Sequence, residues 1–156
     1  MKNVVRIIKA RGGLRKLAGF PAGTGEAIRV EAEGFMPLCI ECIGVSPHGE
    51  GMVLVSVAHY GEQNGDLMRD PDMVFDVSSS EDCPLGWASG NWRPVSFRND
   101  YTGTLQEAVF VDEKGQVMIR PRLLKELREF ARTWDRNIRA QGFVEAAKCL
   151  AHSDTQ

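Results

Sequence analysis

One imidazole and four carboxylates lie within a short stretch in the middle of the chain. They are His59, Glu62, Asp66, Asp70 and Asp72. Hard cations bind several oxygen ligands that a turn can bring together, and a metal that activates water needs about three protein ligands and one open position. These residue types therefore allow a metal-dependent hydrolase or nuclease that uses the segment from His59 to Asp72.

The order of these residues matches neither of two common metal motifs. The stretch lacks the Asp-x-Asp-x-Asp-Gly order of a calcium loop, and Pro71 stands where a flexible loop is expected. The run from His59 to Glu62 also differs from His-Glu-x-x-His, which needs a helix to align its ligands. We therefore expect no metal and no other cofactor, and the hydrolase remains an alternative.

Two further interpretations of the acidic segment stay open. In the first, Asn and Asp side chains cap turns by bonding nearby backbone, and Arg69 pairs with a neighbouring acid. In the second, the carboxylates form an exposed surface that engages the basic groove of a nucleic-acid-binding partner. A polar hairpin tip at 98–103 can lie beside the segment, with Arg98 neutralising part of it. The candidate binding residues are Glu62, Asp66, Arg69, Asp70, Asp72, Asp100 and Tyr101.

Arginines form a second candidate surface near the C-terminus. They fall roughly on one side of a predicted helix and are Arg128, Arg132, Arg136 and Arg139. Arg132 and Arg136 are a like-charge pair one turn apart, which is mildly unfavourable without an acidic neighbour. The acidic segment can supply that neighbour, so direct nucleic-acid binding is a secondary expectation.

The remaining nucleophiles and glycine-rich stretches carry no recognisable catalytic motif. No Gly-x-Ser-x-Gly run occurs, and neither Gly12-Gly13 nor Gly23-Thr-Gly25 continues into a phosphate loop. Cys39 and Cys42 lie in an alternating run that predicts a strand, where residues three apart point to opposite faces. We expect buried, reduced thiols at all four cysteines, and no enzymatic activity.

Hydrophobic spacing predicts the elements that position these groups. The run that starts at Pro121 and ends before Gly142 is a long amphipathic helix, because its apolar residues recur at intervals of three and four. Two further helices are predicted at 3–10 and 143–151, and strands at 27–33, 38–44, 52–58, 73–77, 93–98, 105–112 and 116–119. Residues 58–75 become the end of one strand, an acidic, turn-rich and rigid loop, and the start of the next strand. The fold class is α+β, an antiparallel sheet of about five to seven strands with an N-terminal helix and the long C-terminal helix packed on it.

Size and composition agree with one domain. The chain has 156 residues, 43% of them hydrophobic and 26% charged, and a formal net charge of −2. These values are ordinary for a globular protein. We expect a domain over residues 1–152 and a frayed tail over 153–156. No apolar run is long enough to cross a membrane, and the N-terminus lacks the apolar core of a signal peptide, so we expect a cytoplasmic protein.

Four motifs together resemble a family of domains of unknown function. The longest is His59-Tyr-x-Glu-Gln-Asn-Gly-Asp-Leu-Met-Arg-Asp-Pro-Asp-Met-x-Phe75, and the others lie at 94–101, 106–110 and 130–137. The resemblance covers roughly residues 4–143. It implies a gene carried by plasmids, integrative elements and phages of proteobacteria, near anti-restriction and other anti-defence functions. It carries no established activity and no catalytic residues.

These observations predict a non-catalytic interaction protein of a mobile genetic element. Its partner is expected to be a protein, in particular a host defence complex of protein and nucleic acid that the chain inhibits, as an anti-CRISPR protein does. The acidic segment would supply the recognition surface.

Overall fold

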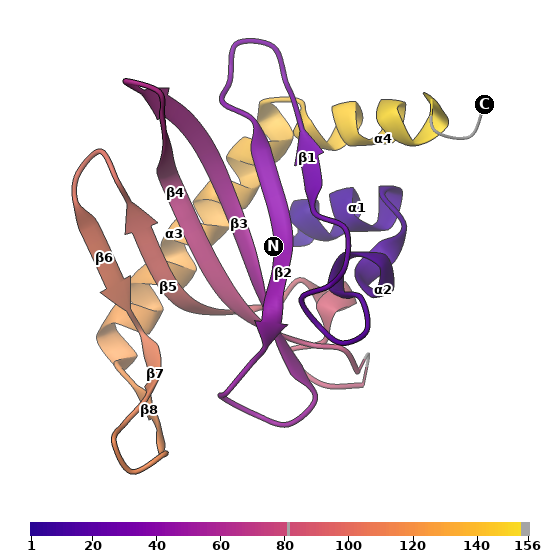
Figure 1. Ribbon diagram of the computed structural model, residues 1–156. Helices are drawn as coiled ribbons and strands as arrows, with labels where there is room; N and C mark the ends of the chain where they lie inside the picture. Colours follow the sequence, from indigo (N-terminus) through magenta and orange to yellow (C-terminus); the bar gives the residue numbers. More distant parts are fainter. Residues whose placement is uncertain (81, 154–156) are drawn as a thin grey trace.

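An antiparallel sheet forms one layer of the molecule, and helices cover one of its faces (Figure 1). The computed structural model describes residues 1–80 and 82–153. The helices are α1 (Lys2–Ala10), α2 (Gly13–Ala18), α3 (Pro121–Ala140) and α4 (Phe143–Ser153), with a short 3-10 turn η1 (Trp87–Ser89). The strands are β1 (Ile28–Val30), β2 (Leu38–Val45), β3 (Met52–Gln63), β4 (Asp66–Ser78), β5 (Arg93–Asn99), β6 (Thr104–Glu107), β7 (Val109–Val111) and β8 (Val117–Ile119).

The six strands β1 to β6 pair in the order of the chain, each antiparallel to the next. Alternate residues of the central strands are buried against the helices, among them Val55, Val57, Met73 and Phe75. This period-two burial is what an antiparallel sheet with one covered face requires. The predicted α+β fold with an antiparallel sheet and flanking N- and C-terminal helices is confirmed.

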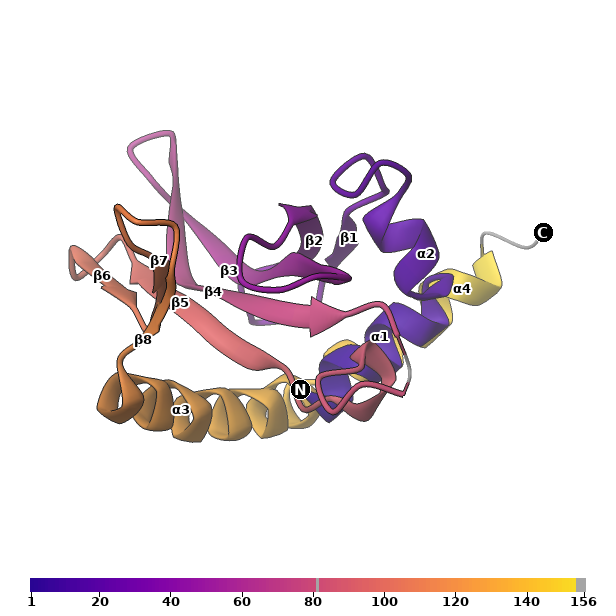
Figure 2. The ribbon, with the colours of Figure 1, turned by 90° about the horizontal axis from the view of Figure 1, so that it is seen from below.

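Helix α3 lies below the sheet and runs across several of its strands (Figure 2). Its buried stripe consists of Leu124, Leu127, Ala131, Trp134 and Ile138. Pro121 occupies the first helical position, where its missing N–H leaves no hydrogen bond unmade. Helix α1 packs between α3 and α4, so the two ends of the chain share one core. None of the described helices is both long and apolar enough to span a membrane.

The prediction of a turn-rich connection at 58–75 is wrong. Strands β3 and β4 continue through this segment as a long hairpin, and Gln63 lies opposite Asp66. Asn64 and Gly65 connect them with φ angles of 54° and 87°. Positive φ at both central residues belongs to the type I′ turn, whose twist matches that of the flanking strands. Asn64-Gly65 therefore connects two strands that the sequence analysis ended too early.

Three smaller expectations also change. Strand β1 is confined to Ile28–Val30, and the strand predicted at 105–112 divides at Ala108. The N–H of Ala108 donates to Val95 while its carbonyl accepts from Arg120, so the chain passes from pairing with β5 to pairing between β7 and β8. Ser153 still belongs to α4, and the rest of the predicted frayed tail lies outside the described residues.

The four thiols are less buried than expected. Only Cys42 is buried, Cys39 and Cys83 are half-buried, and Cys149 is exposed. Cys39 and Cys42 pair with Ala58 and Val55, which lie on opposite faces of the sheet. The two thiols therefore do not converge on one ligand, as their spacing on a strand predicted.

His59 makes the stability of this core dependent on pH. Its ring is buried against Trp134 and Phe143, and Nδ1 lies 3.0 Å from the carbonyl oxygen of Met36. Burial lowers the pKa of His59, while hydrogen bonds to Met36 and Pro37 partly oppose that effect. A lowered folded-state pKa means that the unfolded chain binds the proton more tightly.

We expect the free energy of unfolding to fall as the pH drops below the unfolded value of about 6.5 toward the lower folded value of His59. The steepest contribution that one such group can make is about 1.4 kcal/mol per pH unit. His59→Gln removes the titration but keeps an amide that can donate to Met36. Urea unfolding at several pH values between neutral and mildly acidic checks this, and equal slopes for both proteins would contradict it.

Candidate functional site

The acidic hairpin formed by β3 and β4 divides into a paired root and an exposed tip. The root network comprises Ser56, Arg69, Asp70, Asp72, Arg98, Asn99 and Asp100. The hairpin tip, residues 61–67, extends beyond it. All but Gly61 of the tip residues are exposed. The two parts have different electrostatics and are treated in turn.

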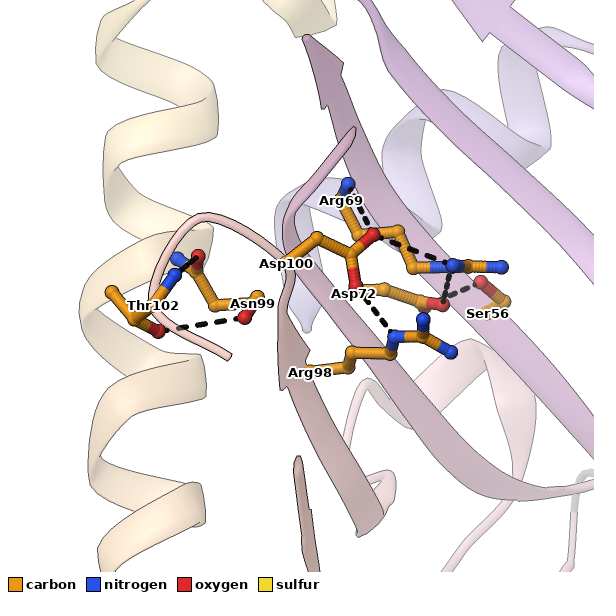
Figure 3. A network of polar contacts seen from close by, with 7 residues as sticks. All are labelled: Ser56, Arg69, Asp72, Arg98, Asn99, Asp100 and Thr102. Carbon is orange, nitrogen blue, oxygen red and sulfur yellow. Dashed lines mark hydrogen bonds and ion pairs between the residues drawn. The ribbon is translucent and has the colours of Figure 1, made fainter. Parts of the chain in front are cut away.

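Asp100 is the centre of the root network and ties the β5–β6 turn to β4 (Figure 3). Its Oδ2 accepts a hydrogen bond from the backbone N–H of Arg69 at 2.9 Å, and its own N–H donates to the Arg69 carbonyl at 2.9 Å. Its Oδ1 accepts from Arg98 Nε at 2.7 Å. The Arg69 N–H and the Arg98 side chain lower the pKa of Asp100. Asp100 is therefore a charged crosslink between the β5–β6 turn and strand β4.

Asp72 is held on the same face of the sheet by one hydrogen bond and one ion pair. Ser56 Oγ donates to its Oδ1 at 2.7 Å, and Arg69 Nε lies 3.4 Å from its Oδ2. Burial raises the pKa of Asp72, and the Ser56 hydrogen bond and the Arg69 charge oppose that rise. The expected pairing of Arg69 with a neighbouring acid is confirmed, and Arg69 has two such partners, Asp72 and Asp100.

The remaining root acid, Asp70, is also bound within the network. Its Oδ1 accepts a hydrogen bond from Asn99 Nδ2 at 2.6 Å. Of the predicted acidic binding residues, Asp70, Asp72 and Asp100 are thus engaged inside the protein. Two cationic side chains, Arg69 and Arg98, balance most of their charge, and the root presents little net charge to a partner.

Glu62 and Asp66 stay outside the network. Both are exposed in the hairpin tip, and no ion pair within the described residues involves either of them. Leu67 is 69% exposed beside Asp66, and Tyr101 places its hydroxyl over Gly61 at the base of the tip. The exposed acidic surface is therefore much smaller than the sequence predicted, but it carries an apolar side chain next to its carboxylates.

His59 does not join the acids in space. It contacts Trp134 of α3, on the covered face of the sheet, whereas Asp72 bonds Ser56 on the other face. Among residues 1–80 and 82–151, no group of three His, Cys, Asp or Glu side chains could hold one metal ion. The ligand set that the hydrolase alternative requires is therefore not assembled from the segment at 59–72.

Three of the four predicted basic residues line one cleft. Arg128, Arg132 and Arg136 lie along α3 beside Lys2, and the cleft has a volume of about 740 Å³. Arg139 is exposed but does not line it. The expectation that the acidic segment would neutralise this row is wrong. Asp72 bonds Ser56 and Arg69 and Asp70 bonds Asn99 instead, and Glu62 and Asp66 form no ion pair within the described residues.

A fully buried carboxylate, Asp76, forms a cluster that sequence reasoning missed. It accepts hydrogen bonds from Ser46 Oγ at 2.5 Å, and from Arg93 Nη2 at 2.7 Å and Nε at 3.0 Å. His48 Nδ1 lies 2.9 Å from Oδ1 of the same carboxylate. In a catalytic triad the serine faces the ring nitrogen that the carboxylate leaves open. Here Ser46 and His48 both contact Asp76 directly, and the serine does not face the ring as it does in a triad. Because both residues belong to the β2–β3 loop region, the cluster holds that loop against β4.

One signal in the sequence points to this cluster. Asp76 interrupts the apolar run Met73–Val77, and a charge in a buried strand requires partners. Arg93 is its cross-strand neighbour in the observed register. That register includes a bulge between Val74 and Phe75, which cannot be read from either strand alone.

The family whose model matches the chain is described as a domain of unknown function (DUF6908). The match spans residues 2–144 and so includes the acidic hairpin, the Asp76 cluster and the arginine row of α3. No curated protein and no solved structure matches the chain.

Proposed function

We propose that this chain, which belongs to the DUF6908 family of domains of unknown function, is a non-catalytic interaction protein that binds a partner through its hairpin tip. The partner is a host defence complex of protein and nucleic acid, and the chain acts as its inhibitor on behalf of a mobile genetic element. The motif resemblance supports the mobile-element setting. The exposed, unpaired carboxylates of Glu62 and Asp66 carry the binding proposal.

The hairpin presents its tip in a preorganised form. The tip stands away from α3 on the long β3–β4 ladder and turns within two residues (Figure 2). Asp100 anchors its root to the neighbouring turn through Arg69. A recognition element that is already ordered loses less conformational entropy on binding. The paired root therefore supports the tip and does not itself form the contact surface.

The chemistry of the tip favours a basic groove with a small apolar depression. Interface centres are enriched in apolar side chains, and charged groups at the rim mainly steer the encounter. Leu67 can fill such a depression while Glu62 and Asp66 lie over its rim. Grooves that carry positive charge are typical of nucleic-acid-binding proteins, so the tip would compete with nucleic acid for the same groove.

The geometry supports a binding role more strongly than a catalytic one. The described part of the chain places His59 in the core and His48 against the buried Asp76. Neither ring is placed beside a serine or thiol nucleophile in the arrangement that covalent catalysis requires. The carboxylates of the acidic hairpin are paired or lie singly at its tip.

A tip variant tests the proposal. Glu62→Gln, Asp66→Asn and Leu67→Ser together should abolish capture of a nucleic-acid-binding host complex, because they remove the charge and the apolar contact. The unfolding midpoint should change by less than about 2 °C, since exposed substitutions away from special features have small effects. Affinity capture from host extract after nuclease treatment, followed by mass spectrometry, measures the loss.

The matched control removes two exposed charges elsewhere, with Glu50→Gln and Glu113→Gln. This variant should capture the same complex as the unchanged protein. The proposal fails when the tip variant captures the same proteins as the control. It also fails when the unchanged protein captures no complex that contains a nucleic-acid-binding subunit.

A further inference from the structure

The basic cleft lies along α3, whereas the hairpin tip stands away from that helix (Figure 2). It is bounded by α3, by the start of α1 and by the segment from Pro84 to Pro94. Its volume of about 740 Å³ is within the range of about 300–1,000 Å³ found for ligand sites. It is therefore large enough to enclose a ligand that the hairpin tip plays no part in binding.

A regular row of cationic groups lines one wall. Arg128, Arg132 and Arg136 are spaced by four residues, so each lies about 6 Å further along the axis of α3 than the one before. All three are exposed, and no carboxylate within the described residues pairs with them. Within the described part of the chain, a side-chain hydrogen bond of the row runs from Arg136 Nη2 to Thr133 Oγ1 at 3.3 Å. Like charges at this spacing repel, and an anionic ligand would relieve the repulsion.

The acid in the cleft lining does not neutralise the row. Asp135 is buried, and its carboxylate accepts hydrogen bonds from the backbone N–H groups of Asn3 and Val4 at 3.1 Å. It also accepts from Asn3 Nδ2 at 3.1 Å. Its charge is directed at the start of α1, where the helix dipole favours a negative group. Lys2, exposed on the facing wall, adds a further positive charge to the cleft.

We propose that this cleft binds a single strand of nucleic acid through its phosphate groups. Guanidinium groups bind phosphate oxygens in a bidentate way, and an evenly spaced row suits a ligand with repeating anions. The aromatic residues of the lining, Phe75 and Trp92, are buried and offer no surface for base stacking. Recognition is therefore independent of base sequence.

Fluorescence anisotropy with a labelled oligo(dT) tests this inference. The full chain should bind the probe with an affinity that falls as salt rises. Three phosphate contacts predict a slope of log K against log salt of about −2 for a single strand. Arg128→Ala, Arg132→Ala and Arg136→Ala together should weaken binding by about tenfold or more and flatten the slope, since each lost phosphate contact reduces its magnitude by about 0.7 on a single strand.

The matched control removes the same charge from the same helix outside the cleft, with Arg122→Ala, Lys125→Ala and Arg139→Ala. It should bind the probe within about threefold of the unchanged chain, because mutations outside the phosphate contacts leave the salt slope in place. A triple Arg→Lys variant of the cleft should keep most of the slope and lose part of the affinity. Circular dichroism establishes that each variant is folded.

Several outcomes overturn the inference. The first is that oligo(dT) does not bind at low salt, and the second is that the control variant loses as much oligo(dT) affinity as the cleft variant. The third is that a duplex of the same length binds more tightly than oligo(dT), and the fourth is that poly-glutamate binds equally tightly. The last two would point to a flat duplex surface or to an acidic peptide. The hairpin-tip variant should bind oligo(dT) normally, so failure of the cleft inference and failure of the proposed function can be told apart.

Discussion

Asp76→Ala is expected to lower the free energy of unfolding by about 3–5 kcal/mol, the usual effect of removing one partner from a buried ion pair. The Asp76 side chain is fully buried and accepts hydrogen bonds from Ser46 and Arg93, with His48 Nδ1 at 2.9 Å. Alanine leaves the largely buried Arg93 guanidinium without a counter-charge and leaves two further polar groups without their partner. Urea unfolding at neutral pH measures the change.

Two variants make this result specific to the carboxylate. Asp76→Asn keeps the shape and one acceptor oxygen, so it should lose stability but less than alanine does. Glu113→Ala, at an exposed turn, should change the free energy by no more than about 0.5 kcal/mol. A loss below about 1 kcal/mol for Asp76→Ala would show that the cluster contributes little to the fold.

The position of Asp76 gives this cluster a structural role at one end of the sheet. It links the β2–β3 loop, through Ser46 and His48, to β4 and to Arg93 at the start of β5. The Asp100 crosslink links β4 to the β5–β6 turn at the other end. The central strands are thus tied by carboxylates at both ends, and the hairpin tip extends beyond the second of them.

Local patterns predicted the elements that bury a continuous apolar stripe. Leu124, Leu127, Ala131, Trp134 and Ile138 occupy the face of α3 that a 3.6-residue period assigns to the core. The strands around Val55 and Phe75 were also predicted, because both runs are rich in valine and other apolar residues, and most of these residues are buried. Where the spacing of side chains and the pairing of backbone agree, one sequence suffices to place an element.

The acidic hairpin was misjudged because its strands do not bury an alternating face. From Glu62 to Leu67 every residue is exposed, so no period-two pattern exists to detect. These strands are extended by backbone hydrogen bonds and not by side-chain burial. The pairing continues outward from the buried part of the β3–β4 ladder at Met52–Ala58. The Asn64-Gly65 pair is a strong hairpin signal, and it was interpreted as an interruption because the flanking residues are polar.

The polar contacts that define the candidate sites depend on tertiary register. Arg69 and Asp100 meet because the β5–β6 turn reaches β4, and that position depends on the bulge between Val74 and Phe75. Asp135 meets Asn3 across nearly the whole length of the chain. Contacts of this kind have no local signature, whereas the arginine row on α3 was found because it lies on one helix.

Asp135 itself carries the second large prediction, because it joins the two ends of the chain. Its carboxylate caps α1 through the N–H groups of Asn3 and Val4 and also binds Asn3 Nδ2, all in a buried position. Asp135→Ala leaves the N–H groups of Asn3 and Val4 without this acceptor, while Asn3 Nδ2 keeps its hydrogen bond to the Asp135 carbonyl at 3.1 Å. Loss of a capping group removes about 1–2 kcal/mol, and hydrogen bonds to a charged group contribute about 1.5–3 kcal/mol.

We therefore expect Asp135→Ala to lower the free energy of unfolding by about 2–4 kcal/mol, measured by urea unfolding at neutral pH. Asn3→Ala removes only the side-chain part of the contact and should lose less, because both backbone N–H groups keep the carboxylate. Equal losses in the free energy of unfolding for the two variants would show that the stabilisation comes from the Asn3 side-chain amide and not from the capped N–H groups of α1. Where Asp135→Ala stays folded, oligo(dT) affinity should not fall, because the substitution removes negative charge from the cleft and leaves Arg128, Arg132 and Arg136 in place.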